Sequence, residues 1–235
     1  MAKASSIAPN RHAVHPFDLK YGTDTGGYLS PQEIATGGPH DALNNGYSAI
    51  APSVFREACR RWRDTLPRLG GHVEAYTFVD VGAGKGRALL LAAEMPFRKV
   101  IGVELSKALA YTAKQNIVQR GCRGFLGAKI RVVRQDAAEF TWPHTPLLVY
   151  LYNSFACELV EQLVARLSTA SAGPGLVDLL YVNPTCAYAL NRGGKFETLW
   201  ADQIDMDEGD RQGDPYGTAS DRVSLFRLRT SGRAH

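Results

Sequence analysis

Five apolar runs beyond residue 75 have the length and composition of buried strands. Each is rich in β-branched or aromatic residues, and turn residues or helix-forming stretches separate one run from the next. The runs are residues 76–81, 99–104, 129–134, 147–152 and 176–182. Strands that alternate with helical stretches are typical of an α/β fold built on a parallel sheet.

Two later runs, 195–200 and 222–229, alternate apolar with polar residues more strictly. That pattern is typical of antiparallel strands with one solvated face, so a terminal antiparallel pair is predicted. Residues 201–221 between them contain glycines and an Asp-Pro turn, and we expect them to form a loop.

The helices are predicted from apolar residues that recur every three or four positions. The first runs from Pro52 to Arg63, with Phe55, Cys59 and Trp62 on one face, and Pro52 suits its first turn. Further helices are predicted over residues 88–94, 106–120 and 156–167. We expect helices on both faces of the sheet, as in other α/β folds.

Residues 1–50 lack this periodicity and are predicted to be an N-terminal arm and loop ahead of a domain at 51–235. Residues 1–20 are expected to be flexible or loosely packed. Residues 21–49 are rich in turn sequences and contain three tyrosines. A long polar loop before a catalytic domain is either a linker or a lid, and the tyrosines favour a lid.

Composition limits the class of protein further. The chain is 45% hydrophobic and 21% charged, which is ordinary for a globular protein, and its net charge of +4 is too small to indicate a nucleic-acid partner. No apolar run approaches the ~18 residues of a membrane span, so no membrane association is expected. The cysteines lack metal-ligand spacing and are expected to be reduced thiols of a cytoplasmic protein. They are Cys59, Cys122, Cys157 and Cys186.

A strand, a glycine-rich turn and a helix follow one another in the stretch Phe78-Val-Asp-Val-Gly-Ala-Gly-Lys-Gly-Arg87. Glycines adopt φ angles closed to other residues and let a ligand approach the backbone. The helix start behind them offers free N–H groups. Together these features predict a ligand of the nucleotide type.

Asp80 and Arg87 distinguish two classes of such ligand. A dinucleotide fingerprint, G-x-G-x-x-G, would have glycine where Arg87 stands. The Asp80 carboxylate would repel a pyrophosphate by a few kcal/mol at ~4 Å. It suits a ligand that carries an ammonium and a sulfonium, namely S-adenosylmethionine (SAM). A nicotinamide-dependent oxidoreductase is therefore the less favoured alternative.

Polar residues also follow the next three predicted strands. Glu104 ends the second strand and is placed to accept hydrogen bonds from a ribose. Asp136 follows the third strand and Asn153 follows the fourth. Because the carboxyl ends of parallel strands line one crevice, we expect all three beside the glycine turn. The structural alternatives are a surface acid for Glu104, a turn residue for Asp136 and a helix cap for Asn153.

The pattern Asp80-x-Gly82-x-Gly84-x-Gly86 resembles motif I of the class I SAM-dependent methyltransferases. The likeness of layout covers about residues 73–230. It implies a Rossmann-like sheet of seven strands in the order 3-2-1-4-5-7-6, with the last strand antiparallel. It also implies SAM as cofactor, S-adenosyl-L-homocysteine as product, and an adenine contact at Asp136.

Within this class, residues 78–87 and the segment Tyr152-Asn-Ser-Phe-Ala156 resemble the non-SET histone-lysine methyltransferases and their bacterial relatives. The corresponding segment of that family reads Asn-Asn-Phe-Ala, so Ser154 departs from it. The resemblance implies that Asn153 is part of the methyl-transfer site.

The predicted function is SAM-dependent methylation of an amine, with a protein lysine as one candidate acceptor. The alternatives are a small-molecule N or O acceptor and a non-catalytic SAM-binding protein. The predicted cofactor contacts are Asp80, Gly82, Ala83, Gly84, Gly86, Glu104, Leu105, Asp136, Ala137 and Asn153. The predicted catalytic residues are Asn153 together with Tyr21, Asp24 and Tyr47 from the loop. No metal is predicted, and the sequence makes no prediction of oligomeric state.

Overall fold

The computed structural model describes residues 14–66, 71–121, 130–170 and 176–229. A seven-stranded sheet runs through it in the order β5-β4-β3-β6-β7-β9-β8. The strands are β3 (Thr77–Val81), β4 (Lys99–Glu104), β5 (Ile130–Arg134), β6 (Leu147–Tyr152), β7 (Val177–Val182), β8 (Phe196–Asp205) and β9 (Ser220–Leu228). Strand β9 is antiparallel to both of its neighbours. Numbered along the chain, this is the order 3-2-1-4-5-7-6, so the predicted sheet is confirmed.

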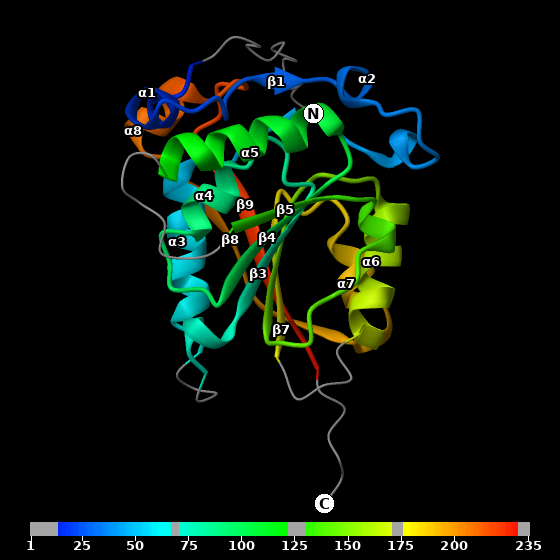
Figure 1. Ribbon diagram of the computed structural model, residues 1–235. Helices are drawn as coiled ribbons and strands as arrows, with labels where there is room; N and C mark the ends of the chain where they lie inside the picture. Colours follow the sequence, from blue (N-terminus) through cyan, green and yellow to red (C-terminus); the bar gives the residue numbers. More distant parts are fainter. Residues whose placement is uncertain (1–13, 67–70, 122–129, 171–175, 230–235) are drawn as a thin grey trace, which may run out of the picture.

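Helices cover both faces of the sheet, which confirms that prediction as well (Figure 1). On one face lie α3 (Pro52–Arg63), α4 (Arg87–Ala92) and α5 (Lys107–Gly121). On the other lie α6 (Cys157–Ala170) and α7 (Ala187–Asn191). The buried residues form two hydrophobic cores, one on each face of the sheet. Side chains alternate between the two faces along each strand, so Phe78 faces α3 while its neighbour Val79 belongs to the core under α6.

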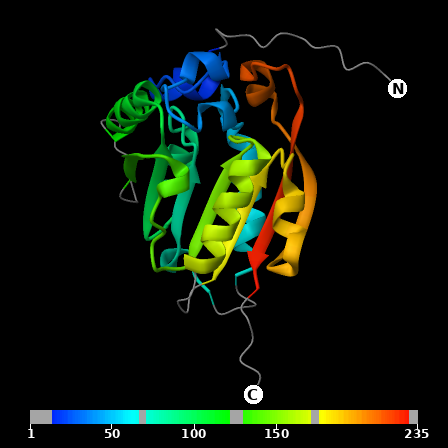
Figure 2. The same ribbon diagram turned by 90° about the vertical axis from the view of Figure 1, so that its right-hand side faces the viewer.

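The N-terminal segment, residues 14–50, lies across one end of the sheet in both ribbon views (Figures 1 and 2). Its elements are α1 (Pro16–Tyr21), β1 (Tyr28–Leu29), α2 (Pro31–Ile34), a 3-10 helix (Asp41–Leu43) and β2 (Tyr47–Ser48). The predicted loose packing of residues 1–20 is wrong for 16–20, because α1 buries Phe17 and Asp18. Residues 1–13 lie outside the described residues.

The predicted loop at 201–221 is also corrected. Strand β8 continues to Asp205, and α8 (Glu208–Gly213) begins after Asp207, whose side chain accepts from the backbone N–H of Asp210 (2.8 Å). Most residues of the β8 edge strand are exposed or half-buried, so its sequence carries little apolar alternation to reveal it.

The cysteine prediction is wrong for two residues. Cys157 and Cys186 form a disulfide with a Cα–Cα distance of 5.3 Å, across 29 residues of sequence. The two residues follow β6 and β7, adjacent parallel strands whose carboxyl ends meet at one edge, and spacing alone could not reveal this. Cys59 is buried and unbonded, and Cys122 lies outside the described residues. Because disulfides persist mainly in oxidising compartments, the cytoplasmic location stays a prediction.

Among the described helices, none is long and apolar enough to cross a membrane. The same part of the chain holds no group of three or more side chains suited to a metal ion.

A buried carboxylate joins three elements on the α3 face of the sheet. Asp178 of β7 is fully buried and accepts from the indole N–H of Trp62 in α3 (2.8 Å). It also accepts from Nε and Nη2 of Arg227 in β9, at 2.6 and 2.8 Å. A charge is tolerated in this apolar layer because both of its oxygens accept hydrogen bonds.

We expect Asp178→Ala to lower the free energy of unfolding by about 3–5 kcal/mol, because it leaves the Arg227 guanidinium buried without its partner. Urea denaturation measures the change. Asp202→Ala is the matched control, since it removes an exposed acid paired with Arg61 and should cost no more than about 1 kcal/mol. Equal losses in the two variants would contradict the assignment.

Candidate functional site

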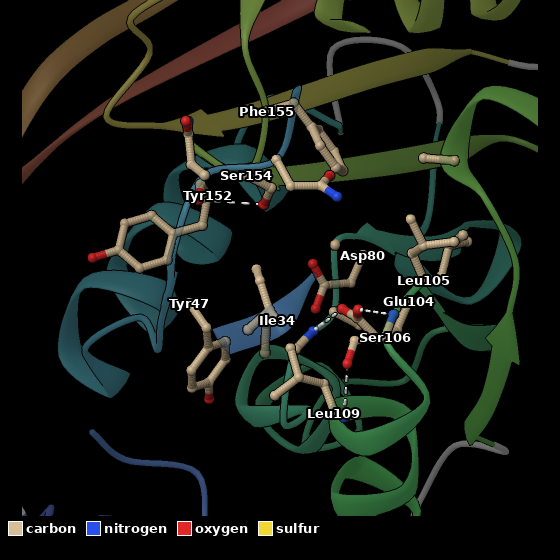
Figure 3. A pocket seen from close by; sticks show the side chains of 18 of the residues that line it. Ile34, Tyr47, Asp80, Glu104, Leu105, Ser106, Leu109, Tyr152, Ser154 and Phe155 are labelled. Atoms are coloured by element: carbon tan, nitrogen blue, oxygen red, sulfur yellow. Dashed lines mark hydrogen bonds between the residues drawn. The ribbon is translucent and has the colours of Figure 1, made fainter. Parts of the chain in front are cut away.

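A cavity lies at the carboxyl ends of β3, β4 and β6, beneath the N-terminal segment (Figure 3). From the sheet side it is lined mainly by Asp80, Gly82, Ala83, Gly84, Glu104, Leu105, Asp136, Ala137, Tyr150, Tyr152 and Ser154. The N-terminal segment contributes Ile34, His40, Tyr47 and Ser48. The cavity is therefore closed by residues that precede the sheet in sequence.

Two acids share the floor of this cavity. Asp80 and Glu104 lie on one face of adjacent strands, and both are buried. The Glu104 oxygens accept from the backbone N–H groups of Gly84 (2.8 Å) and Ser106 (2.7 Å). Burial, reinforced by the Glu104 charge, raises the pKa of Asp80 to about 8. Burial also raises the pKa of Glu104, although its backbone hydrogen bonds lower it. A cationic group beside Asp80 would relieve this repulsion.

The glycine turn makes room for other parts of the chain. Gly84 has φ +54°, and a Cβ added to it would lie 2.2 Å from the Tyr47 ring. Gly82 has φ +80°, and its Cβ would lie 2.8 Å from the Ser154 side chain. These two glycines therefore let the N-terminal segment and the loop after β6 close on the turn.

A buried ion pair holds the N-terminal segment in place. Arg87, the first residue of α4, lies 3.2 Å from Asp18 and donates from Nε to Thr25 Oγ1 (2.7 Å). Asp18 in turn accepts from the backbone N–H and the hydroxyl of Thr25. The Tyr47 hydroxyl donates to the Thr25 carbonyl (2.7 Å), which fixes the ring over Gly84. Arg87, which stands where a dinucleotide site would have glycine, therefore holds the N-terminal segment over the cavity.

His40 of the N-terminal segment lines the cavity beside Asp136. Its Nδ1 lies 2.6 Å from Asp136 Oδ2, while Asp136 Oδ1 accepts from the Ala138 N–H (2.8 Å). The predicted residue Asp136 is thus linked to the N-terminal segment.

The fold resembles those of solved methyltransferases. No protein-family model matches the sequence, and no curated protein matches it. An RNA methyltransferase from Salinibacter ruber in complex with S-adenosyl-L-homocysteine superposes with TM-score 0.52 at 14% identity, over 80% of this chain and 98% of that one. A protein described as a methylase from Haemophilus influenzae superposes with TM-score 0.51 at 18% identity, over 79% of this chain and 94% of that one.

The chain has the class I methyltransferase fold. The narrower likeness to the non-SET histone-lysine enzymes is not supported by these comparisons and stays a prediction.

Within this methyltransferase fold, most predicted cofactor residues come together. Those that line the cavity are Asp80, Gly82, Ala83, Gly84, Glu104, Leu105, Asp136 and Ala137. Gly86 instead caps α4, where its backbone has φ +87° and packs against Ala113. Their individual roles stay predictions, although the common location agrees with them.

Of the predicted catalytic residues, Tyr47 lines the cavity and the other three do not. Asp24 has a 72% exposed side chain paired with Lys85 (2.8 Å). The Tyr21 ring lies 3.8 Å from the Arg120 guanidinium, on the α5 side. Asn153 has φ +43°, and its side-chain oxygen accepts from Thr185 (2.9 Å), so Ser154 takes the place facing the cavity.

Sequence reasoning missed two tyrosines of β6. Tyr150 pairs with Asp80 in the sheet register, and Tyr152 lies two residues further along the same face. The Tyr150 hydroxyl is buried without a hydrogen-bond partner in the described chain. Side chains alternate between the two faces of a strand, and this alternation directs Asp80 of β3 into the cavity. The same alternation applied to β6 could have predicted that Tyr150 and Tyr152 face the cavity too.

We expect Asp80→Asn to stabilise the ligand-free protein at pH 8 and above. The unfolded chain loses this proton near pH 4 and the folded chain near pH 8, so the wild type loses stability as pH rises between these values. Asparagine removes that loss. Thermal unfolding should show a Tm about 5 °C higher than wild type at pH 8 and little difference at pH 4. Asp24→Asn, at an exposed position, is the control; a Tm difference for Asp80→Asn that does not change with pH would exclude this origin.

Proposed function

We propose that this protein is a SAM-dependent methyltransferase. The observation that carries the proposal is the acid pair Asp80 and Glu104, placed in a covered cavity beside a turn with left-handed glycines. Asp80 accepts no hydrogen bond from any residue in the described part of the chain. An ammonium from the methionine end of SAM would supply that partner, and the ribose hydroxyls would suit Glu104.

The cations near the turn support the same choice. Arg87 is already paired with Asp18, and Lys85 is paired with Asp24. A pyrophosphate would therefore meet two acids without an unpaired cation from either residue. This distribution of charge disfavours the nicotinamide alternative.

Bound SAM would supply a methyl group that its sulfonium makes electrophilic. The chain then has to exclude water and hold the acceptor in line, and such positioning is worth roughly 7–11 kcal/mol. Tyr47 and Ile34 cover the cavity from the N-terminal segment, opposite the two acids (Figure 3). In this proposal they exclude water, while Asp80 and Glu104 orient the cofactor.

The β6 side of the cavity favours an amine as acceptor. Burial, reinforced by the charges of Asp221 and Asp214, raises the pKa of the Tyr152 phenol well above its usual value. Tyr152 therefore stays neutral and lies in a negative field, which attracts a protonated amine. Burial of that amine would lower its pKa and free its lone pair. A protein lysine is one such acceptor, and a small molecule remains the alternative, as does a non-catalytic SAM-binding protein.

A nucleic acid is a second candidate acceptor. The sequence made it unlikely on net charge alone, yet the Salinibacter ruber neighbour is an RNA methyltransferase. Nucleobases also carry nitrogen nucleophiles, so the likeness of fold keeps this candidate open.

We expect calorimetry to detect binding of SAM and S-adenosyl-L-homocysteine at micromolar concentration, and none of NAD. Glu104→Ala should weaken SAM binding by ~1.5–3 kcal/mol, because it removes a charge-assisted acceptor. Asp24→Asn should leave SAM affinity within about threefold, since Asp24 lies outside the cavity. Binding of NAD without SAM would overturn the proposal.

Incubation with methyl-labelled SAM and host lysate should identify the acceptor. We expect label in a fraction that protease removes if the acceptor is a protein lysine, and in one that ribonuclease removes if it is RNA. Tyr152→Phe removes the hydroxyl that would hold the acceptor amine in this field, so it should lower the rate of label transfer at least fivefold and leave SAM affinity unchanged. SAM binding without label transfer to any fraction would favour the non-catalytic alternative.

A further inference from the structure

A second hollow lies outside the cofactor cavity, between α5 and the end of β5. It is lined by Lys107, Ala108, Ala110, Tyr111, Lys114 and Arg134. Lys107, Tyr111 and Lys114 follow one another at helical spacing on the outer face of α5, and Tyr111 is 64% exposed. Arg134 comes from the edge strand of the sheet. The hollow therefore combines three cations with one accessible aromatic ring.

The positive charge of this hollow is uncompensated. Helix α5 contains no aspartate or glutamate, and none of the three cations has an ion-pair partner in the described chain. Elsewhere the exposed arginines of α3 are paired, as Arg60 is with Glu57 and Arg61 with Asp202. Like charges gathered without counter-charges favour an anionic partner.

This hollow adjoins the cofactor cavity. Ser106, Leu109 and Gln135 line the cavity, and each is the immediate chain neighbour of a residue that lines the hollow. A chain-like ligand docked along α5 would therefore lie next to residues that form the wall of the cavity. Successive anionic groups could then occupy the hollow while another part of the ligand reached the cavity.

We infer that the α5–β5 hollow is a docking surface for single-stranded RNA. Phosphates suit Lys107, Lys114 and Arg134, and an unpaired base can stack on the exposed Tyr111 ring. An acidic peptide would use the cations but not the ring. Unpaired bases are the usual recognition sites of RNA, whereas DNA presents them less often. The inference goes beyond the proposed function, because docking does not require methyl transfer.

Fluorescence anisotropy with a labelled 20-nucleotide oligouridylate, without SAM, tests this surface. The triple variant Lys107→Ala, Lys114→Ala, Arg134→Ala should bind at least tenfold more weakly in 50 mM salt and show a shallower salt dependence. Tyr111→Ala should bind about fivefold or more weakly, and Tyr111→Phe should bind like the wild type.

A matched triple variant, Arg63→Ala, Arg192→Ala, Lys195→Ala, removes the same charge from other exposed positions and should retain most of the affinity. An equal loss of affinity in the two triple variants would show that binding depends only on net charge and would overturn the inference. Wild-type binding to polyglutamate but not to the oligonucleotide would overturn it in favour of an acidic protein. SAM affinity of the α5–β5 triple variant, measured separately, shows whether the cofactor site remains intact, so failure of docking and failure of the proposed function are distinguishable.

Discussion

The ion pair between Arg87 and Asp18 is the interaction on which the site depends. It joins the first residue of α4 to a helix near the start of the described chain, and both side chains are buried. Removing one partner of such a pair typically costs about 3–5 kcal/mol, because the other charge is left without compensation. Through Thr25 the same pair fixes Tyr47, whose ring lies against Gly84. Without it, the cavity would lack its cover.

Charge is divided between the inside and the outside of this cover. The cations closest to the glycine turn are neutralised by acids of the N-terminal segment, while the two acids Asp80 and Glu104 lie inside, where burial raises the pKa of both. The cavity therefore selects against phosphates even though its turn resembles a phosphate-binding one. Lys107 and Lys114, which have no ion-pair partner among the described residues, stand on the outer surface of α5.

Local patterns were enough to predict the strands, four of the helices and the position of the two acids, while the strand order came from the family resemblance. Strand composition and glycine spacing are properties of a few consecutive residues, so they can be read directly from the sequence. The N-terminal segment could not be read in this way, because its order rests on the contact of Asp18 with a residue 69 positions later. The disulfide also depends on two elements that only the fold brings together. At Asn153 the strand ends in a residue with positive φ, so the side chain presented to the cavity shifts by one position to Ser154.

The contacts of α1 also have a consequence for the order in which the chain becomes structured. Helix α1 packs against α8, where His15 lies 3.5 Å from Asp210. During synthesis, α1 leaves the ribosome long before either Arg87 or Asp210 has been made, and a six-residue helix is not stable by itself. Asp18 must remain hydrated until Arg87 has been made, and His15 lacks its neighbour until Asp210 follows. The cover of the cavity is thus translated before the sheet that it covers, and its packing is completed only after Asp210 has been made.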